Sequence, residues 1–161
     1  MTRHNQRGSL IIEVLVSISM AVIFSLAIGS LVGVNNRLTT VARHDARGLS
    51  LAKESMEQVF AAKQQSWASI SGLGDGKYTI IEQDNLFQLQ PDVSPTGEEF
   101  ADGFFRTVEV KTAYRGADGQ LGLSGEPDPN VRRLVVTVTW LERGANRDVQ
   151  LEGFITNWKG N

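Results

Sequence analysis

Residues 8–34 read GSLIIEVLVSISMAVIFSLAIGSLVGV, and this stretch decides the fold. From Ser9 to Val34 the chain has 26 residues and a single charged side chain, Glu13. A helix needs about 20 apolar residues to cross the hydrocarbon core of a bilayer. A carboxylate inside such a segment is costly and usually functional. The pattern therefore predicts a membrane-spanning helix over residues 9–34 in which Glu13 has a specific role.

The position of Gly8 argues against an ordinary secretory signal peptide. Such signals have an apolar core of about 7–15 residues and a cleavage site after it. Here the small residue lies before the apolar run, directly after Arg7. The sequence Arg7-Gly8-Ser9-Leu10-Ile11-Ile12-Glu13-Val14-Leu15-Val16 resembles the prepilin leader junction of type IV pilins and type II secretion pseudopilins.

The resemblance implies specific processing and a role for the buried acid. A membrane-bound prepilin peptidase would cut between Gly8 and Ser9 and methylate the new amine of Ser9. Glu13 would then pair with the Ser9 amine of a neighbouring subunit in a filament. An ammonium and a carboxylate that are each costly in apolar surroundings become tolerable as a hydrogen-bonded pair. Two other roles for Glu13 stay open: complementing the helix dipole, or pairing with the Ser9 amine of its own chain.

Two further segments resemble PilV-like and GspI-like minor pilins, namely residues 46–59 and residues 135–158. The resemblance implies a structural subunit of a type IV pilus-like filament or secretion pseudopilus. Its partners would be other pilin or pseudopilin subunits, the prepilin peptidase and an inner-membrane assembly platform. It would begin as a single-pass protein of the cytoplasmic (inner) membrane with an extracytoplasmic head, and then enter the filament. The alternative is an uncleaved, bitopic membrane-anchored binding module, which would keep residues 1–8.

The amino-acid composition argues against several other classes of function. The 161 residues include no cysteine, so disulfides and thiolate metal sites are excluded. Without residues 1–8 the chain would carry 14 basic and 18 acidic side chains, which gives nucleic-acid binding no support. One histidine, His4, lies in the leader, and we expect the other, His44, to stand alone on a polar helix face. We therefore expect no enzyme activity, since no acid–base pair is indicated.

Beyond Val34 the helix is predicted to continue to about Ser66, because apolar residues recur on one face at helical spacing and no proline interrupts the segment. The predicted organisation is a leader (1–8), a membrane or filament-core helix (9–34), an amphipathic helix (35–70) and a β-sheet head (71–161). The residues expected on the apolar face of the amphipathic part are Leu38, Val41, Ala42, Leu49, Ala52, Met56, Val59, Phe60 and Trp67.

After residue 71 the apolar period changes to two, which indicates strands. The predicted strands are Lys77–Gln83, Leu86–Gln90, Phe104–Tyr114, Val131–Leu141 and Asp148–Trp158, with polar loops at 91–103 and 115–130 and a turn at 142–146. The expected fold class is α+β and pilin-like. A long N-terminal helix would pack on an antiparallel sheet of four to five strands, because only its amphipathic half can cover the apolar face of the sheet.

The loop at 115–130 contains oxygen ligands for a hard cation. Asp118, Glu126 and Asp128 are calcium candidates, and the resemblance adds that some pseudopilins bind calcium in a comparable loop. The EF-hand spacing is absent, and prolines flank Asp128. A solvated hairpin loop is therefore the preferred interpretation, and no metal or other cofactor is assigned.

Overall fold

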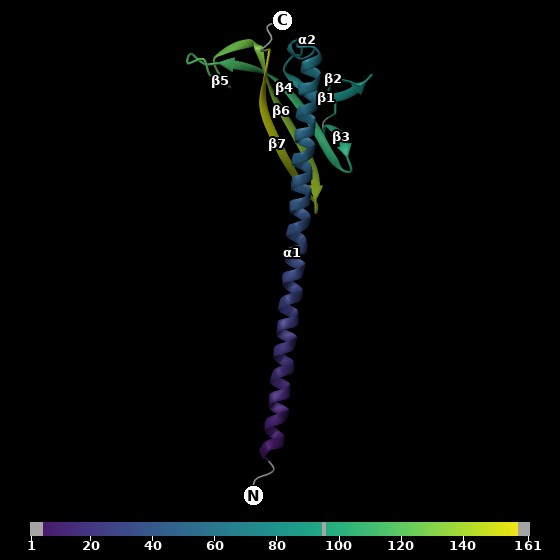
Figure 1. Cartoon of the computed structure of the whole chain (residues 1–161), viewed down its shortest axis with the longest axis vertical. Helices are drawn as coiled ribbons and strands as arrows, with labels where there is room; N and C mark the ends of the chain where they lie inside the picture. Colours follow the sequence, from purple (N-terminus) through teal and green to yellow (C-terminus); the bar gives the residue numbers. More distant parts are fainter. Residues whose placement is uncertain (1–4, 95, 158–161) are drawn as a thin grey trace. The chain divides into compact units, whose positions relative to one another are not determined.

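The computed structural model describes residues 5–94 and 96–157, with side chains from Leu10 onward. Its elements in chain order are α1 (Asn5–Gln65), α2 (Ala68–Ser71), β1 (Gly76–Gln83), β2 (Leu86–Pro91), β3 (Glu98–Ala101), β4 (Phe104–Arg115), β5 (Leu121–Gly122), β6 (Glu126–Glu142) and β7 (Ala145–Thr156) (Figure 1). The described residues form two compact units that divide between Arg43 and His44, within α1. We call the second unit, from His44 onward, the head.

The predicted α+β class is confirmed: the C-terminal part of a long N-terminal helix packs on an antiparallel sheet. The helix ends at Gln65, close to the predicted Ser66, and one further turn, α2, follows. The amide of Gly72 closes that turn by donating to the carbonyl oxygen of Ala68 at 3.2 Å. Glycine-rich turn residues therefore separate the helical and β-rich parts, as the sequence indicates.

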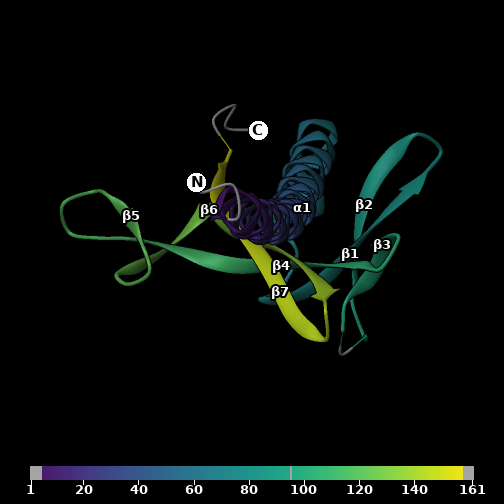
Figure 2. The same ribbon diagram turned by 90° about the horizontal axis from the view of Figure 1, so that it is seen from below.

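The sheet follows the strand order β2-β1-β4-β6-β7, with all neighbours antiparallel. Two short strands, β3 and β5, also pair with β4, which makes the sheet seven-stranded within the described residues. The five strands of the main path correspond to the five predicted, but β6 begins at Glu126 and β7 runs from Ala145 to Thr156. Trp158, the predicted end of the last strand, lies outside the described residues. The predictions of continuous loops at 91–103 and 115–130 were wrong in part, because β3, β5 and the start of β6 lie in them. Viewed from below, the β5 region extends away from the rest of the sheet (Figure 2).

Two-residue turns set the register of the sheet. Asp84 and Asn85, between β1 and β2, have φ angles of 54° and 61°. Arg143 and Gly144, between β6 and β7, have φ angles of 52° and 82°, so the turn is shorter than the predicted 142–146. Left-handed geometry at both central residues is typical of type I′ turns, whose twist matches that of antiparallel strands.

The face of α1 that covers the sheet is formed mostly by small residues. The buried positions of α1 within the head are Gly48, Leu51, Ala52, Ser55, Val59 and Ala62. They pack against strand residues such as Val108, Leu134, Val136, Val138 and Ile155, all of which have lost their solvent contact. Small side chains on this face of the helix leave room for these bulky side chains of the sheet.

This buried face differs from the predicted stripe. Ala52 and Val59 are buried as expected, and Met56 packs beside the core. Phe60 is 37% exposed, which contradicts its prediction as a core residue. Leu51, Ser55 and Ala62 were not predicted and are buried. The helix is apolar on more than one side, so hydrophobicity alone does not identify the face that the sheet selects.

One charged side chain is buried between the helix and the sheet. Arg106 of β4 is 3% exposed and lies on the same face of its strand as Val108. Its guanidinium donates to Gln58 Oε1 of α1 at 2.8 Å and to Glu98 Oε2 of β3 at 2.6 Å. It also lies 4.0 Å from the centre of the Phe100 ring. Arg106 therefore connects α1, β4 and β3 through one set of contacts.

Candidate functional site

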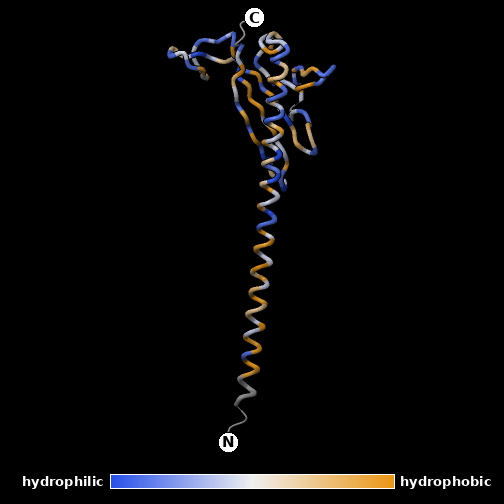
Figure 3. Tube along the Cα trace, viewed as in Figure 1, coloured by the Kyte–Doolittle hydropathy of each residue, from blue (hydrophilic) through white to orange (hydrophobic). Residues whose placement is uncertain are grey.

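The N-terminal part of α1 exposes nearly all of its apolar side chains. Leu10, Ile23, Phe24 and Leu31 are each at least 60% exposed, and residues 10–34 contain no buried side chain. Hydrophobic residues predominate along this part of the helix (Figure 3). Among the described residues it is the one segment long and apolar enough to cross a membrane.

The serines of this segment satisfy their own hydrogen-bonding groups. The hydroxyls of Ser17, Ser19 and Ser25 donate to the carbonyl oxygens four residues earlier, at 2.7–2.8 Å, and Ser30 donates to Ala27 at 2.8 Å. A helix whose backbone and hydroxyl groups are bonded internally can lie in lipid or against other helices without exposing unpaired polar groups.

Glu13 is the exception in this segment. Its backbone carbonyl oxygen accepts the Ser17 hydroxyl, but its carboxylate makes no hydrogen bond or ion pair with a side chain in residues 10–94 or 96–157. The side chain is exposed, so a positively charged group can reach the carboxylate. The backbone of Gly8 and Ser9 is part of α1. The side chains of residues 5–9 and the whole of residues 1–4 are outside the part of the chain that the structure describes. Cleavage after Gly8 and methylation of Ser9 stay predictions.

The calcium candidates do not form a metal site in the described chain. Asp128 accepts hydrogen bonds from Arg115 Nε and a terminal guanidinium nitrogen at 3.0 and 2.8 Å. The backbone amide of Asn130 lowers the pKa of Asp128 most, and the Arg115 hydrogen bond lowers it further. Asp118 accepts the amide of Gln120 at 3.0 Å, and Glu126 begins strand β6. No cluster of three metal-binding side chains occurs among the described residues.

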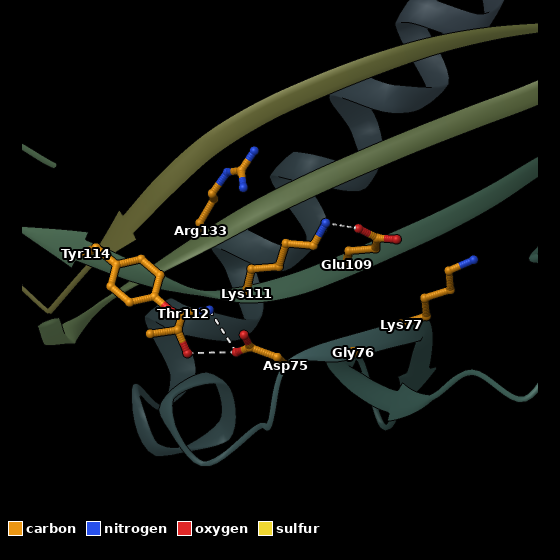
Figure 4. Close-up of a pocket in the computed structure, with 8 residues that line it drawn as sticks. All are labelled: Asp75, Gly76, Lys77, Glu109, Lys111, Thr112, Tyr114 and Arg133. Carbon is orange, nitrogen blue, oxygen red and sulfur yellow. Dashed lines mark hydrogen bonds and ion pairs between the residues drawn. The ribbon is translucent and has the colours of Figure 1, made fainter. Parts of the chain in front are cut away.

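The outer face of the sheet has two shallow cavities. The smaller, of about 260 Å³, is lined by Asp75, Gly76, Lys77, Glu109, Lys111, Thr112, Tyr114 and Arg133 (Figure 4). Three of its charged side chains are in ion pairs, since Lys111 pairs with Glu109 and Arg133 pairs with Glu152. Asp75 accepts a hydrogen bond from the Thr112 hydroxyl. The larger, of about 420 Å³, is lined mainly by threonines and apolar side chains. In neither lining do the described residues include a histidine.

The sequence analysis missed a contact of His44. We predicted this side chain to be alone, but His44 Nδ1 lies 2.6 Å from Glu142 Oε2 at the end of β6. The His44 ring also meets Phe104 edge to face, at 6.3 Å between ring centres. Glu142 is only 8% exposed, and the hydrogen bond from His44 is the main cause that lowers its pKa. The inward position of Glu142 could have been read from its alternation with Trp140 and Val138.

Comparisons of the chain with protein-family models, curated proteins and solved structures find no match. The architecture is nevertheless pilin-like: a long helix, apolar in its N-terminal part, whose C-terminal part packs on an antiparallel sheet. The site that this architecture defines is the exposed apolar segment of α1 with Glu13 near its start.

Proposed function

We propose that this chain is a structural minor pilin or pseudopilin. It is cut between Gly8 and Ser9, methylated on the Ser9 amine and assembled into a type IV pilus-like filament or a type II secretion pseudopilus. The observation that carries the proposal is an exposed apolar helical segment whose single carboxylate, Glu13, has no partner among the described side chains.

Burial of the apolar segment is the driving force in this proposal. Each Å² of apolar surface removed from water contributes roughly 25 cal/mol. Lipid can cover the apolar side chains of residues 10–34, but it offers Glu13 no countercharge. Packing against the helices of other subunits covers the same surface and also brings a Ser9 ammonium to the carboxylate. Only the second environment satisfies both features of the segment.

The proposed mechanism is assembly and not catalytic turnover. The prepilin peptidase processes the chain in the inner membrane, and an assembly platform then transfers it into the filament. The head, on the extracytoplasmic side, supplies lateral contacts to neighbouring subunits. No cofactor is required for any of these steps.

The mature N-terminus tests the processing step. Mass spectrometry of the protein purified from native membranes should find residues 1–8 absent and one methyl group on the Ser9 amine. Recovery of the intact N-terminus would favour the alternative, a bitopic anchor that carries an extracytoplasmic binding head.

Substitution of Glu13 tests the assembly step. Glu13→Ala should be cleaved normally, because the scissile bond is untouched, but should enter filaments on the order of a hundredfold less, since an unpaired buried ammonium costs several kcal/mol. Quantitative immunoblots of sheared filaments and of membranes measure the distribution. Glu54→Gln, which changes an exposed acid of the same helix, is the matched control and should assemble normally. Normal incorporation of Glu13→Ala would remove the assigned role of Glu13.

A further inference from the structure

The main path of the sheet has two edge strands, β2 and β7, and they differ in how open they are to a further strand. β2 has six residues and ends at Pro91, whereas β7 has 12 residues, no proline and an unshifted register with β6. Between Val149 and Ile155 the only charged side chain of β7 is Glu152, which is bonded to Arg133. Short length, proline, bulges and charges are the usual protection of an edge strand. Strand β7 therefore has a long edge with little protection, and no strand of the described chain covers it.

The register shows which backbone groups of β7 are directed to this free edge. The Asn157 amide donates to the Asn130 carbonyl oxygen at 2.9 Å, one step beyond the register pair of Thr156 and Val131. In an antiparallel pair, hydrogen-bonded residues alternate with residues whose N–H and C=O groups point away from the partner strand. The odd-numbered residues from 145 to 155 therefore bond β6. The residues whose N–H and C=O groups point outward are Asn146, Asp148, Gln150, Glu152 and Phe154.

Helix α1 runs alongside β7 on the inner face of the sheet. Gly48 of α1 lies against the Trp140 ring, and Trp140 is the register partner of Arg147. Further along the helix, Met56 lies against Gly153, where an added Cβ would be 3.7 Å from the Met56 methyl carbon. Helix α1 and strand β7 therefore run in the same direction, and Met56 marks the side of the helix that faces β7.

An apolar surface accompanies the free edge on this side. Val149 and Leu151 of β7 are only partly buried against the core, and so is Met56 of α1. Phe60, which follows Met56 by about one turn on the same side of the helix, is 37% exposed. Gly153 has no side chain, and a glycine within a strand often marks a place where another backbone comes close. An added strand would therefore cover apolar side chains of both β7 and α1.

The two rows of side chains on β7 define the chemistry of the strand that fits. The row that faces α1 is uncharged from Val149 to Ile155. The outer row contains two carboxylates, Asp148 and Glu152, and no basic side chain. Glu152 is paired with Arg133, whereas Asp148 is exposed and has no ion pair within the described residues. Because opposite charges on neighbouring strands attract, a fitting strand has apolar side chains toward α1 and basic side chains on the outer face.

A second copy of this chain does not suit the edge. Antiparallel pairing of two β7 edges would also make the two α1 helices antiparallel, because α1 and β7 run in the same direction. The two His44 residues, from which each chain leads back to its apolar segment, would then lie at opposite ends of the joined sheet. That arrangement does not suit two copies anchored in one membrane. Parallel pairing of the two edges would turn one copy over, so that the apolar row of each β7 would meet the acidic row of the other.

We propose that the free edge of β7 binds an extended segment of another protein as an added strand. The backbone of that segment bonds the outward N–H and C=O groups of Asp148, Gln150 and Glu152. Its side chains are alternately apolar, packing toward Met56 and Phe60, and basic, facing Asp148. In such complexes the backbone hydrogen bonds give affinity and the alternate side chains give specificity. Only the argument against a second copy rests on the membrane-inserted state in the proposed function.

Amide hydrogen exchange of the full chain in non-ionic detergent, resolved by NMR, tests this proposal. The probe is the synthetic peptide acetyl-KVKFTVKV-amide, in which apolar residues alternate with basic or polar ones. At saturating peptide the amides of Asp148, Gln150 and Glu152 should exchange on the order of tenfold more slowly, because they gain hydrogen-bond partners. The amides of Val149 and Leu151 should change less, since they already bond β6.

Two matched pairs of reagents identify the contact. Gln150→Pro removes an outward N–H and no bond to β6, a position at which edge strands tolerate proline, and it should weaken peptide binding about tenfold or more. Gln150→Thr keeps the amide and should bind as the native chain does. For the native chain, the peptide is also N-methylated either at its odd or at its even residues. Only one of these two peptides should bind, because only one set of its amides faces β7.

Each outcome decides for or against the added strand. Alternating protection along β7 that is lost in Gln150→Pro supports the proposal. Unchanged exchange at millimolar peptide overturns it, as do equal binding of the two N-methylated peptides, full binding by Gln150→Pro, or protection of β2 in place of β7. The same alternating protection without peptide, rising with protein concentration, would identify a second copy as the occupant and would also overturn it. None of these outcomes bears on cleavage after Gly8 or on entry into filaments, so the proposed function fails or stands separately.

Discussion

Gly48 shows how one missing side chain sets the distance between the helix and the sheet. A Cβ atom added at this position would lie 2.6 Å from Cζ3 of Trp140 and 3.0 Å from Cη2. The Trp140 ring is 4% exposed and stacks beside Phe104 at 5.4 Å between ring centres. A ring so enclosed has little space into which it can move. Glycine in a helix is usually unfavourable, and here the close approach of the ring explains it.

Gly48→Ala should therefore destabilise the head, although alanine is the better helix former. We expect a loss of about 1–3 kcal/mol in the free energy of unfolding, because overpacking outweighs a helix-propensity gain of about 1 kcal/mol. Thermal unfolding in non-ionic detergent, followed by tryptophan fluorescence, measures the effect. Gly74→Ala, where a Cβ would meet nothing within 4 Å, is the control.

A double-mutant cycle identifies the cause. In a Trp140→Phe background, which removes part of the contacted ring, Gly48→Ala should cost much less than in the native chain. Equal costs in both backgrounds would show that the Trp140 contact is not what excludes a side chain at position 48.

At the scale of elements, Arg106 explains why the short strand β3 stays attached. β3 has four residues and pairs only with β4. Glu98 of β3 is 33% exposed and bonds the guanidinium of Arg106, which also reaches Ser55 Oγ at 3.4 Å and the Ile80 carbonyl oxygen at 3.3 Å. The buried charge thus adds polar contacts between α1, β4 and β3 to the apolar packing of Phe100 and Ala101 against the core.

Removal of only one partner should be worse than removal of both charges. Glu98→Ala leaves the Arg106 charge buried without a countercharge, and we expect a loss of about 3–5 kcal/mol in the free energy of unfolding. Arg106→Met/Glu98→Gln removes the buried charge while keeping the volume of the side chain, and should be less destabilised. Denaturant unfolding of the three proteins provides the comparison. A double variant less stable than Glu98→Ala would show that the polar contacts of Arg106 matter more than its charge.

Elements whose sequence signals lie in neighbouring residues were predicted correctly, and features that depend on distant residues were not. The turn at Asp84-Asn85 and the alternation around Val108 and Val136 are local, and the corresponding strands were predicted correctly. The buried face of α1 depends on which small residues the sheet can approach, and this is a tertiary property. Burial of Ser55 and exposure of Phe60 therefore contradicted an assignment based on hydrophobicity.

At the scale of the whole chain, the candidate site was predictable in part for the same reason. The apolar segment and Glu13 are read from consecutive residues, and the structure shows this segment exposed. The contact between His44 and Glu142 joins residues 98 positions apart, and no short pattern signals it.

The head as a whole should lose stability in acid, because three of its carboxylates have lowered pKa values in the folded state. Hydrogen bonds lower the pKa of Glu142 through His44, of Glu152 through Arg133 and of Asp128 through the Asn130 amide. A carboxylate with a depressed folded-state pKa stabilises the protein above its unfolded pKa. That contribution is lost as the pH falls through the folded-state value. The free energy of unfolding should therefore change little from these groups between about pH 7 and pH 5 and decrease below about pH 4.5.

Unfolding curves of the full chain at successive pH values, compared with those of two variants, test the assignment. Glu152→Gln removes one titrating partner of Arg133, so its curve should start lower at neutral pH and fall less steeply in acid. Glu82→Gln, at an exposed acid on β1 without an ion pair among the described residues, should match the native slope. If Glu152→Gln keeps the full acid slope, the exposed pair with Arg133 contributes too little to matter, and the acid sensitivity must come from the less exposed Glu142 and Asp128. Variants Glu142→Gln and Asp128→Asn would then each flatten the curve, and a native slope in all three variants would contradict the prediction.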